Sequence, residues 1–207
     1  MIFQDPTLKN APPKWAEVDK ALGSFVPPDL LGFPCNPGAL NYFRSRYRMA
    51  KSFQGMTLET YQPETVEGYS ALMKTFLSYS AFEAYLGCVG IELKDTLPLA
   101  APYDPAGCEA AVRAIQMHDS FLKGVLKHLD SKTFIAQYEF FLNSKPSNVI
   151  YLPGGIRHIF AHGILTPNTG AGWTAPTIQV CRELDRFLFS IMDGDFIARL
   201  KATGYIQ

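Results

Sequence analysis

Proline is unevenly distributed along this 207-residue chain, and its distribution limits where helices can form. Seven of the fifteen prolines lie in residues 1–37, including Pro12-Pro13 and Pro27-Pro28. Because proline lacks a backbone donor and restricts the residue before it, this segment excludes long helices. We predict an extended arm with short turns over residues 1–37. Its large apolar side chains are too numerous for a free linker and should lie on the domain surface or on a partner: Trp15, Leu22, Phe25, Leu30, Leu31 and Phe33.

Beyond the arm, apolar residues recur at intervals of three and four, which is the period of amphipathic helices. The short segment Pro153-Gly154-Gly155 is interpreted as a turn. The sequence therefore predicts an all-α bundle of about five main helices, forming one domain over residues 38–207. The predicted helices cover residues 38–53, 63 to 87 or 90, 107–129, 132–143 and 155–165, followed by a long helix that Thr174 caps and that Asp193-Gly194-Asp195 interrupts.

Composition favours a soluble protein in a reducing compartment. The chain is 47% hydrophobic, which is ample for a core. Its first ten residues lack the basic start and apolar run of a signal peptide, and no segment approaches the roughly 20 apolar residues of a membrane helix. We therefore expect a cytoplasmic protein without membrane contact. The cysteines show no short paired spacing, so the sequence indicates neither a metal knuckle nor a redox pair at Cys35, Cys88, Cys108 and Cys181.

The formal charge of the whole chain is balanced. Lysine plus arginine and aspartate plus glutamate each number 19, so no overall field attracts polyanions, and any nucleic-acid contact must be local. One candidate RNA contact is the basic stripe of Arg44, Arg48 and Lys51, which share the face opposite the apolar residues of the 38–53 helix. The stripe is either a solvated face that covers the core or a strip that contacts phosphates.

Two titratable residues fall on apolar stripes. Glu83 lies seven residues after Phe76 in the 63–90 helix, so its carboxylate either turns inward and needs a cation, or stands where the stripe meets water. His118 lies on the apolar face of the 107–129 helix. It is either a satisfied core residue or part of a site.

Several enzyme templates are excluded because their residues are missing. The chain has no phosphate-loop Gly-Lys-Ser/Thr, no Gly-x-Ser-x-Gly and no His-Glu-x-x-His. A dedicated metal site is not expected, although His158 and His162 at i and i+4 have a spacing that allows one shared ion. The remaining candidates for chemistry are Arg157, His158 and His162.

The segment that holds these three residues resembles the signature of the HEPN family, a group of helical nucleases, toxins and nucleotide-associated proteins. That signature has an arginine, usually followed by a polar residue, and a histidine four to six residues later. The resemblance covers residues 62 to 193 and not the arm. It rests on the local sequence Ile156-Arg157-His158-Ile159-Phe160-Ala161-His162-Gly163.

The resemblance implies a metal-independent endoribonuclease of defence or toxin type that needs no cofactor, with a composite site at a homodimer interface. Arg157 would bind the scissile phosphate, His162 would act as acid and base, and His158 would be the polar helper. An antitoxin or a nucleotidyltransferase-like protein would be a partner. The alternative within the family is a non-catalytic module that binds a nucleotide or another protein.

The residues themselves support part of this assignment. Arg157, expected in the first turn of its helix, would grip a phosphate beside free backbone N–H groups, and His162 exchanges protons near neutral pH. Five residues of helix rotate by about 500°, leaving the two side chains about 140° apart, and a two-fold dimer would bring such groups together. Glu83 is expected to pair with Arg157. The competing structural interpretation is a helix cap with a buried His162 and with Arg157 paired to an internal glutamate.

Overall fold

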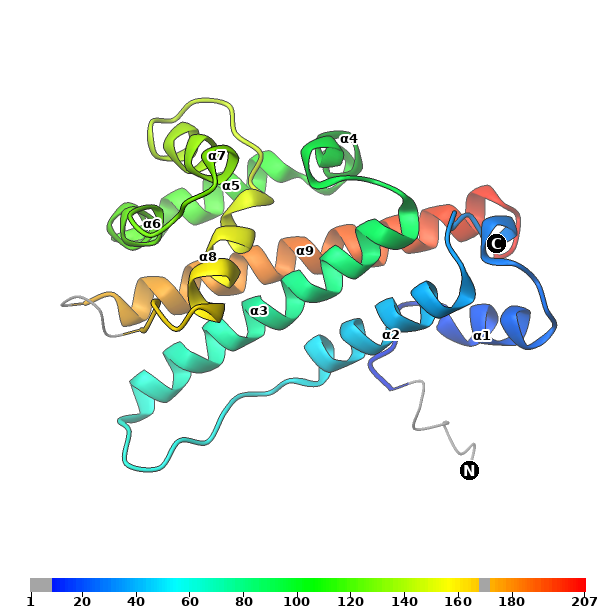
Figure 1. The fold of residues 1–207 in the computed structure, drawn as a ribbon, viewed down its shortest axis with the longest axis horizontal. Coiled ribbons are helices and arrows are strands. Elements are labelled where there is room, and N and C mark those ends of the chain that lie inside the picture. The colour runs from blue at the N-terminus through cyan, green and yellow to red at the C-terminus, as the bar shows by residue number, and fades with distance from the viewer. Residues whose placement is uncertain (1–8, 168–171) are drawn as a thin grey trace. The chain divides into compact units, whose positions relative to one another are not determined.

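The computed structural model describes residues 9–167 and 172–207, and every regular element within these ranges is helical. This confirms the all-α class. The described part contains more helices than the five main ones predicted, because several are short (Figure 1). The α-helices are α1 (Trp15–Gly23), α2 (Pro37–Ser52), α3 (Pro63–Val89), α4 (Thr96–Ala100), α5 (Pro105–Ala114), α6 (His118–Leu126), α7 (Lys132–Leu142), α8 (Tyr151–Ala161) and α9 (Thr174–Ala202), with 3-10 turns η2 (Pro28–Leu31), η3 (Leu93–Asp95) and η4 (Ala101–Tyr103).

The chain packs as two compact units. Of the described residues, unit 1 combines 9–53, 80–103 and 189–207, and unit 2 combines 54–79, 104–167 and 172–188. The long helices α3 and α9 each contribute residues to both units. None of the helices in the described ranges combines the length and apolar composition that a membrane crossing requires.

The segment predicted as an extended arm contains a helix. Residues 15–23 form α1, which the proline-free stretch between Pro13 and Pro27 permits. The Trp15 ring stacks on Phe196 of α9 at a centroid distance of 6.0 Å, and Phe33 lies 4.8 Å from the same ring. The arm therefore supplies core residues of unit 1. Phe25 and Leu30, in contrast, are exposed.

The predicted interruption of the last helix is also absent, since α9 continues through Asp193, Gly194 and Asp195. Each of these residues has a packing role in unit 1. Asp193 accepts a hydrogen bond from Tyr47 and pairs with Lys51, whose Nζ is 3.3 Å away. The missing side chain of Gly194 leaves room for the Tyr103 ring.

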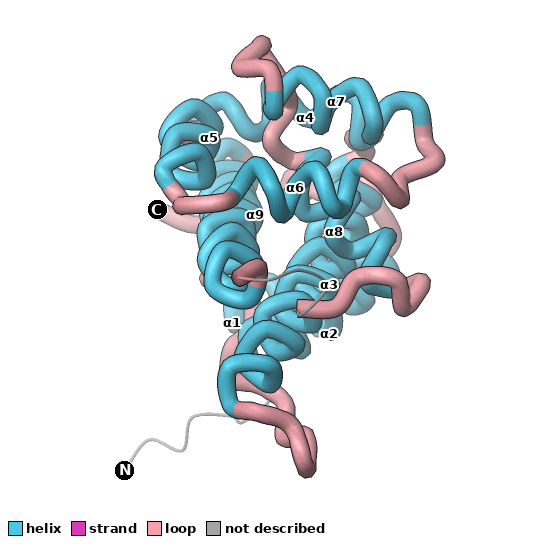
Figure 2. Tube along the Cα trace, turned by 90° about the vertical axis from the view of Figure 1, so that its left-hand side faces the viewer, coloured by secondary structure: helices cyan, strands magenta, loops and turns pink. Residues whose placement is uncertain are grey.

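The predicted 107–129 helix is divided into α5 and α6. Met117 adopts a left-handed conformation with φ of 63°, which turns the chain between them. His118 follows this turn, and its Nδ1 lies 2.8 Å from the carbonyl oxygen of Ile115. Its ring contacts Phe141 edge-on at 6.3 Å. These two contacts fit a His118 whose hydrogen bonding is satisfied by the fold, rather than a His118 that belongs to a functional site. Figure 2 shows α5, α6 and α7 as short helices joined by loops.

Candidate functional site

The helix that carries the Arg-His motif begins earlier than predicted. α8 starts at Tyr151, so Gly154 and Gly155 lie inside the helix rather than in a turn. A Cβ on Gly154 would lie 2.6 Å from the Tyr79 hydroxyl, and one on Gly155 would lie 2.5 Å from the Tyr138 hydroxyl. The two glycines therefore let α8 pack closely on neighbouring side chains of unit 2. The Gly154-Gly155 pair is visible in the sequence, but in the structure it allows close packing of the helix and does not form a turn.

Arg157 lies in the second half of α8. Its predicted place in the first turn is wrong, because the helix begins six residues before it, and the backbone N–H groups of the helix start cannot assist it. The half-buried side chain holds its guanidinium carbon 5.7 Å from the centre of the Phe76 ring on α3. A cation over an aromatic face is attracted by the ring quadrupole, which fixes the direction of this side chain.

His158 and His162 form a close pair at the end of α8. Their ring centroids are 4.6 Å apart with the planes inclined by 70°. His162 is the C-cap residue and is exposed, so the interpretation as a buried histidine is wrong for this residue. Spacing of four residues places both rings on one face, about 40° apart in rotation. Two titratable groups that face solvent together can divide the roles of proton donor and acceptor.

Asp130 joins the histidine pair from the loop before α7. Its Oδ1 lies 3.5 Å from His158 Nε2, and its side chain is 83% exposed. The sequence alone does not indicate this contact, because nothing local connects residue 130 with residue 158. The tertiary packing of unit 2 creates the contact. A contact this exposed contributes little to stability, but it can orient the imidazole ring.

Glu83 is exposed, so the expectation that it turns inward is wrong. The buried stripe of α3 passes through Leu72, Thr75, Tyr79 and Phe82. Helix rotation places Glu83 within about 40° of Leu72 and Tyr79, yet its side chain reaches solvent at this level of the helix. Glu83 belongs to unit 1 whereas Arg157 belongs to unit 2. Their pairing therefore stays a prediction.

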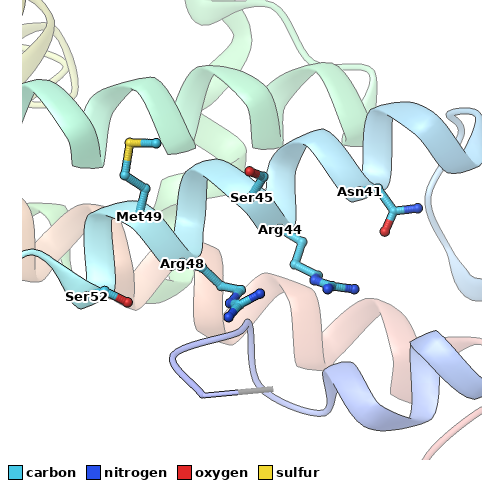
Figure 3. Close-up of a pocket in the computed structure, with 6 residues that line it drawn as sticks. All are labelled: Asn41, Arg44, Ser45, Arg48, Met49 and Ser52. Carbon is cyan, nitrogen blue, oxygen red and sulfur yellow. The ribbon is translucent and has the colours of Figure 1, made fainter. Parts of the chain in front are cut away.

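The predicted basic stripe divides into two parts. Lys51 pairs with Asp193 and lies 4.3 Å from the Phe189 ring, so it has a structural role in unit 1. Arg44 and Arg48, in contrast, line a surface depression on α2 together with Asn41, Ser45, Met49 and Ser52 (Figure 3).

A buried polar cluster in unit 2 has no counterpart in the sequence analysis. Asp185 of α9 is 7% exposed, and the hydroxyl-bearing side chains of Thr75 and Ser78 on α3 are fully buried. Burial raises the pKa of Asp185 to about 8, although the two nearby hydroxyls and Lys74 act in the opposite direction. The hydroxyls lie close enough to affect the carboxyl group, yet none is aligned for a hydrogen bond with its Oδ1. Helical periodicity in the sequence indicates that such positions are buried, but it does not show that polar residues from two helices meet there.

No cluster of three or more His, Cys, Asp or Glu side chains in residues 9–167 and 172–207 could hold a metal ion. No protein-family model, curated protein or solved structure matches the chain. The resemblance to HEPN proteins therefore rests on the Arg157, His158 and His162 motif and on the all-helical architecture.

Proposed function

We propose that the protein is an endoribonuclease of defence or toxin type, in which His158 and His162 transfer protons and Arg157 binds phosphate. The observation that carries the proposal is the close pair of half-buried His158 and exposed His162, with ring centroids 4.6 Å apart. The Arg-polar-x-x-x-His spacing supports the same assignment.

RNA cleavage without a metal needs two proton transfers. The ribose 2′-OH attacks the adjacent phosphorus, the new 2′-O–P bond forms and the bond to the 5′ oxygen breaks. One imidazole takes the proton of the 2′-OH, and a protonated imidazole gives a proton to the leaving oxygen. His162 is the more exposed of the two rings and acts as the base, whereas His158, held by Asp130, acts as the acid. The products are a 2′,3′-cyclic phosphate and a free 5′-OH.

Arg157 supplies the positive charge that the phosphate needs. Its guanidinium lies over Phe76, on a different side of α8 from the histidine pair, since one residue of helix turns the direction by about 100°. A homodimer related by a two-fold axis near α8 would bring Arg157 of a second copy to the histidine pair of the first. Such a composite site needs both chains for activity.

The second candidate is a non-catalytic module that binds a nucleotide or a protein. The half-buried position of Arg157 over Phe76 favours it, because a residue held in this way also has a structural role. In this case the histidine pair would bind a ligand without cleaving it.

The test incubates the purified protein with mixed RNA in the presence of a chelator and analyses the ends of the fragments. We expect fragments with 2′,3′-cyclic phosphate ends, and a weaker activity in Asp130→Asn, which removes the charge that orients His158. Lys123→Gln, which removes an exposed surface charge on α6, serves as the control. Intact RNA, or fragments that end in a 3′-OH, would contradict the proposal.

A further inference from the structure

Positive charge is concentrated on α2 although the whole chain is neutral. The helix carries four cations and no carboxylate, whereas lysine plus arginine and aspartate plus glutamate each number 19 in the chain. Asp19 pairs with Arg44 and Asp193 pairs with Lys51, which offsets part of this charge, and the remaining local excess attracts phosphates even without a net charge on the molecule. The cations are Arg44, Arg46, Arg48 and Lys51.

The open depression on α2 is lined by donors that suit an anion. Its volume is about 450 Å³, and Figure 3 shows the side chains of Arg44 and Arg48 directed to the same side of the helix. Arg44 Nη1 lies 3.3 Å from the half-exposed Asp19, and Arg48 Nε donates to the carbonyl oxygen of Lys9 at 3.3 Å. These contacts hold both guanidinium groups in place beside the depression. The amide and hydroxyl groups of the lining come from Asn41, Ser45 and Ser52.

An exposed aromatic ring lies farther round α2, about 120° in rotation from Arg48, so a strand that reaches both has to pass across the helix. Tyr42 is 52% exposed, and the guanidinium carbon of Arg46 lies 4.9 Å from its ring centre. An exposed ring beside arginines is a stacking platform for an unpaired base. The sequence gives no sign of this ring contact, because Tyr42 does not belong to the stripe of Arg44, Arg48 and Lys51.

We propose that α2 binds single-stranded RNA, with phosphates on Arg44 and Arg48 and a base on Tyr42. Single strands fit better than duplexes, because a base can stack on Tyr42 only when it is unpaired. This surface is in unit 1, and its binding needs neither His158 nor His162. The proposal therefore stands or fails independently of the cleavage reaction.

The test measures binding of a fluorescent 2′-O-methyl oligonucleotide, which lacks the attacking 2′-OH, by anisotropy at several salt concentrations. Ser45→Glu places a carboxylate in the depression without removing a contact, and Ser45→Gln is the matched neutral control. We expect Ser45→Glu to weaken binding at least tenfold and Ser45→Gln to leave it unchanged. Arg48→Gln should reduce the slope of log affinity against log salt by about 0.7.

A separate variant tests the stacking of a base on Tyr42. Tyr42→Ala should weaken binding by roughly 5- to 100-fold with an unchanged salt slope, because it removes a base contact and no charge. Lys123→Gln removes one positive charge from α6, as Arg48→Gln does from α2, and should bind like the parent. The proposal is wrong if the parent protein does not bind the oligonucleotide, if it prefers a duplex, or if Ser45→Glu binds as tightly as Ser45→Gln.

A second observation concerns two cysteines that are far apart in sequence. The Cys88 thiol lies 3.3 Å from the carbonyl oxygen of Ala39, and a Cβ on Gly90 would be 3.5 Å from Pro34 Cγ. The end of α3 therefore packs against the segment that leads into α2. Cys35 stands between Pro34 and α2, so this packing brings the Cys35 and Cys88 side chains together, and each thiol affects the pKa of the other. The sequence does not indicate this pair, because Cys35 and Cys88 are far apart along the chain.

We infer that Cys35 and Cys88 form a disulfide when the protein meets an oxidant such as glutathione disulfide. The thiolate of the more exposed Cys35 attacks glutathione disulfide and releases one glutathione. The Cys88 thiolate then displaces the second glutathione and closes the protein disulfide, so two protein thiols are oxidised and one glutathione disulfide is reduced to two thiols. Burial raises the pKa of both cysteines, which makes the reaction slow at neutral pH and faster in alkaline buffer.

The test incubates the folded protein with glutathione disulfide, blocks the remaining thiols and maps the peptides by mass spectrometry. We expect one cross-linked peptide pair, a loss of two hydrogen atoms per chain, and a higher melting temperature that a reductant reverses. Cys108→Ser, which alters a thiol of unit 2, should still form the link, and Cys88→Ser should not. Recovery of Cys35 and Cys88 as separate blocked thiols, or as mixed disulfides with glutathione only, would overturn the inference.

Discussion

The position that a Cβ on Gly155 would occupy lies 2.5 Å from the hydroxyl of Tyr138. Tyr138 is fully buried and donates a hydrogen bond to the carbonyl oxygen of Leu152 at 2.6 Å, so its ring cannot move away without losing that bond. Gly155→Ala should therefore lower the free energy of unfolding by about 1 to 3 kcal/mol. Urea denaturation measures the change. Gly87→Ala is the control, since this helical glycine has open space around it and the substitution should stabilise α3 by up to about 1 kcal/mol.

The buried Asp185 predicts an unusual dependence of stability on pH. Its pKa rises from 3.8 to about 8 on folding, so at neutral pH the folded chain holds a proton that the unfolded chain releases. The folded state then binds more protons, and the free energy of unfolding should fall as pH rises from about 4 to about 8 and level off above. The full shift corresponds to roughly 6 kcal/mol. Lys74 and Cys181 are the other charged or titratable groups that act electrostatically with this carboxyl.

Asp185→Asn removes this ionisation and keeps the shape of the side chain. We expect the variant to lose most of the slope between pH 4 and pH 8 and to be more stable than the parent at pH 8. Chemical denaturation at several pH values makes the comparison. A parent and a variant with parallel pH profiles would show that Asp185 is already ionised in the folded protein.

Asp195 holds two neighbours in unit 1. Its Oδ2 accepts hydrogen bonds from the Tyr85 hydroxyl and from Arg199 Nε, each at 2.6 Å. Asp195→Ala leaves both donors without this acceptor and should cost about 2 to 4 kcal/mol of unfolding free energy. Tyr85→Phe removes one partner and leaves the pair with Arg199, so it should cost about 1 kcal/mol. Equal melting temperatures of the two variants would contradict this order.

The helices with the strongest signals were predicted closely. The boundaries of α2 and α3 follow from apolar periodicity and from proline in the first turn, which its fixed φ and missing donor allow. The division between α5 and α6 was missed because Met117 has no intrinsic preference for a left-handed conformation. The local sequence Asp193-Gly194-Asp195 predicts a break in the helix. Contacts with Tyr47, Tyr85 and Tyr103 override that local preference, so α9 continues.

Only part of the candidate site could likewise be predicted from the sequence. The four-residue spacing of His158 and His162 is visible in the sequence, and one helix brings them together. Asp130 and Tyr42 became candidates only in the structure, because loop packing places the first and solvent exposure distinguishes the second. Local sequence carries neither kind of information.

The central claim is that His162 transfers a proton during RNA cleavage, and the decisive measurement compares cleavage and thermal melting of His162→Ala and the parent on the same preparations. His162 is exposed at the C-cap of α8, so its loss should leave the melting temperature close to that of the parent. Cleavage should fall by roughly 100- to 10,000-fold, the usual value of general acid-base assistance. Arg157→Ala should also lose activity, by removing the charge that positions the phosphate. A His162→Ala protein that melts like the parent and cleaves RNA at the parent's rate, or a parent that does not cleave RNA, would contradict the account.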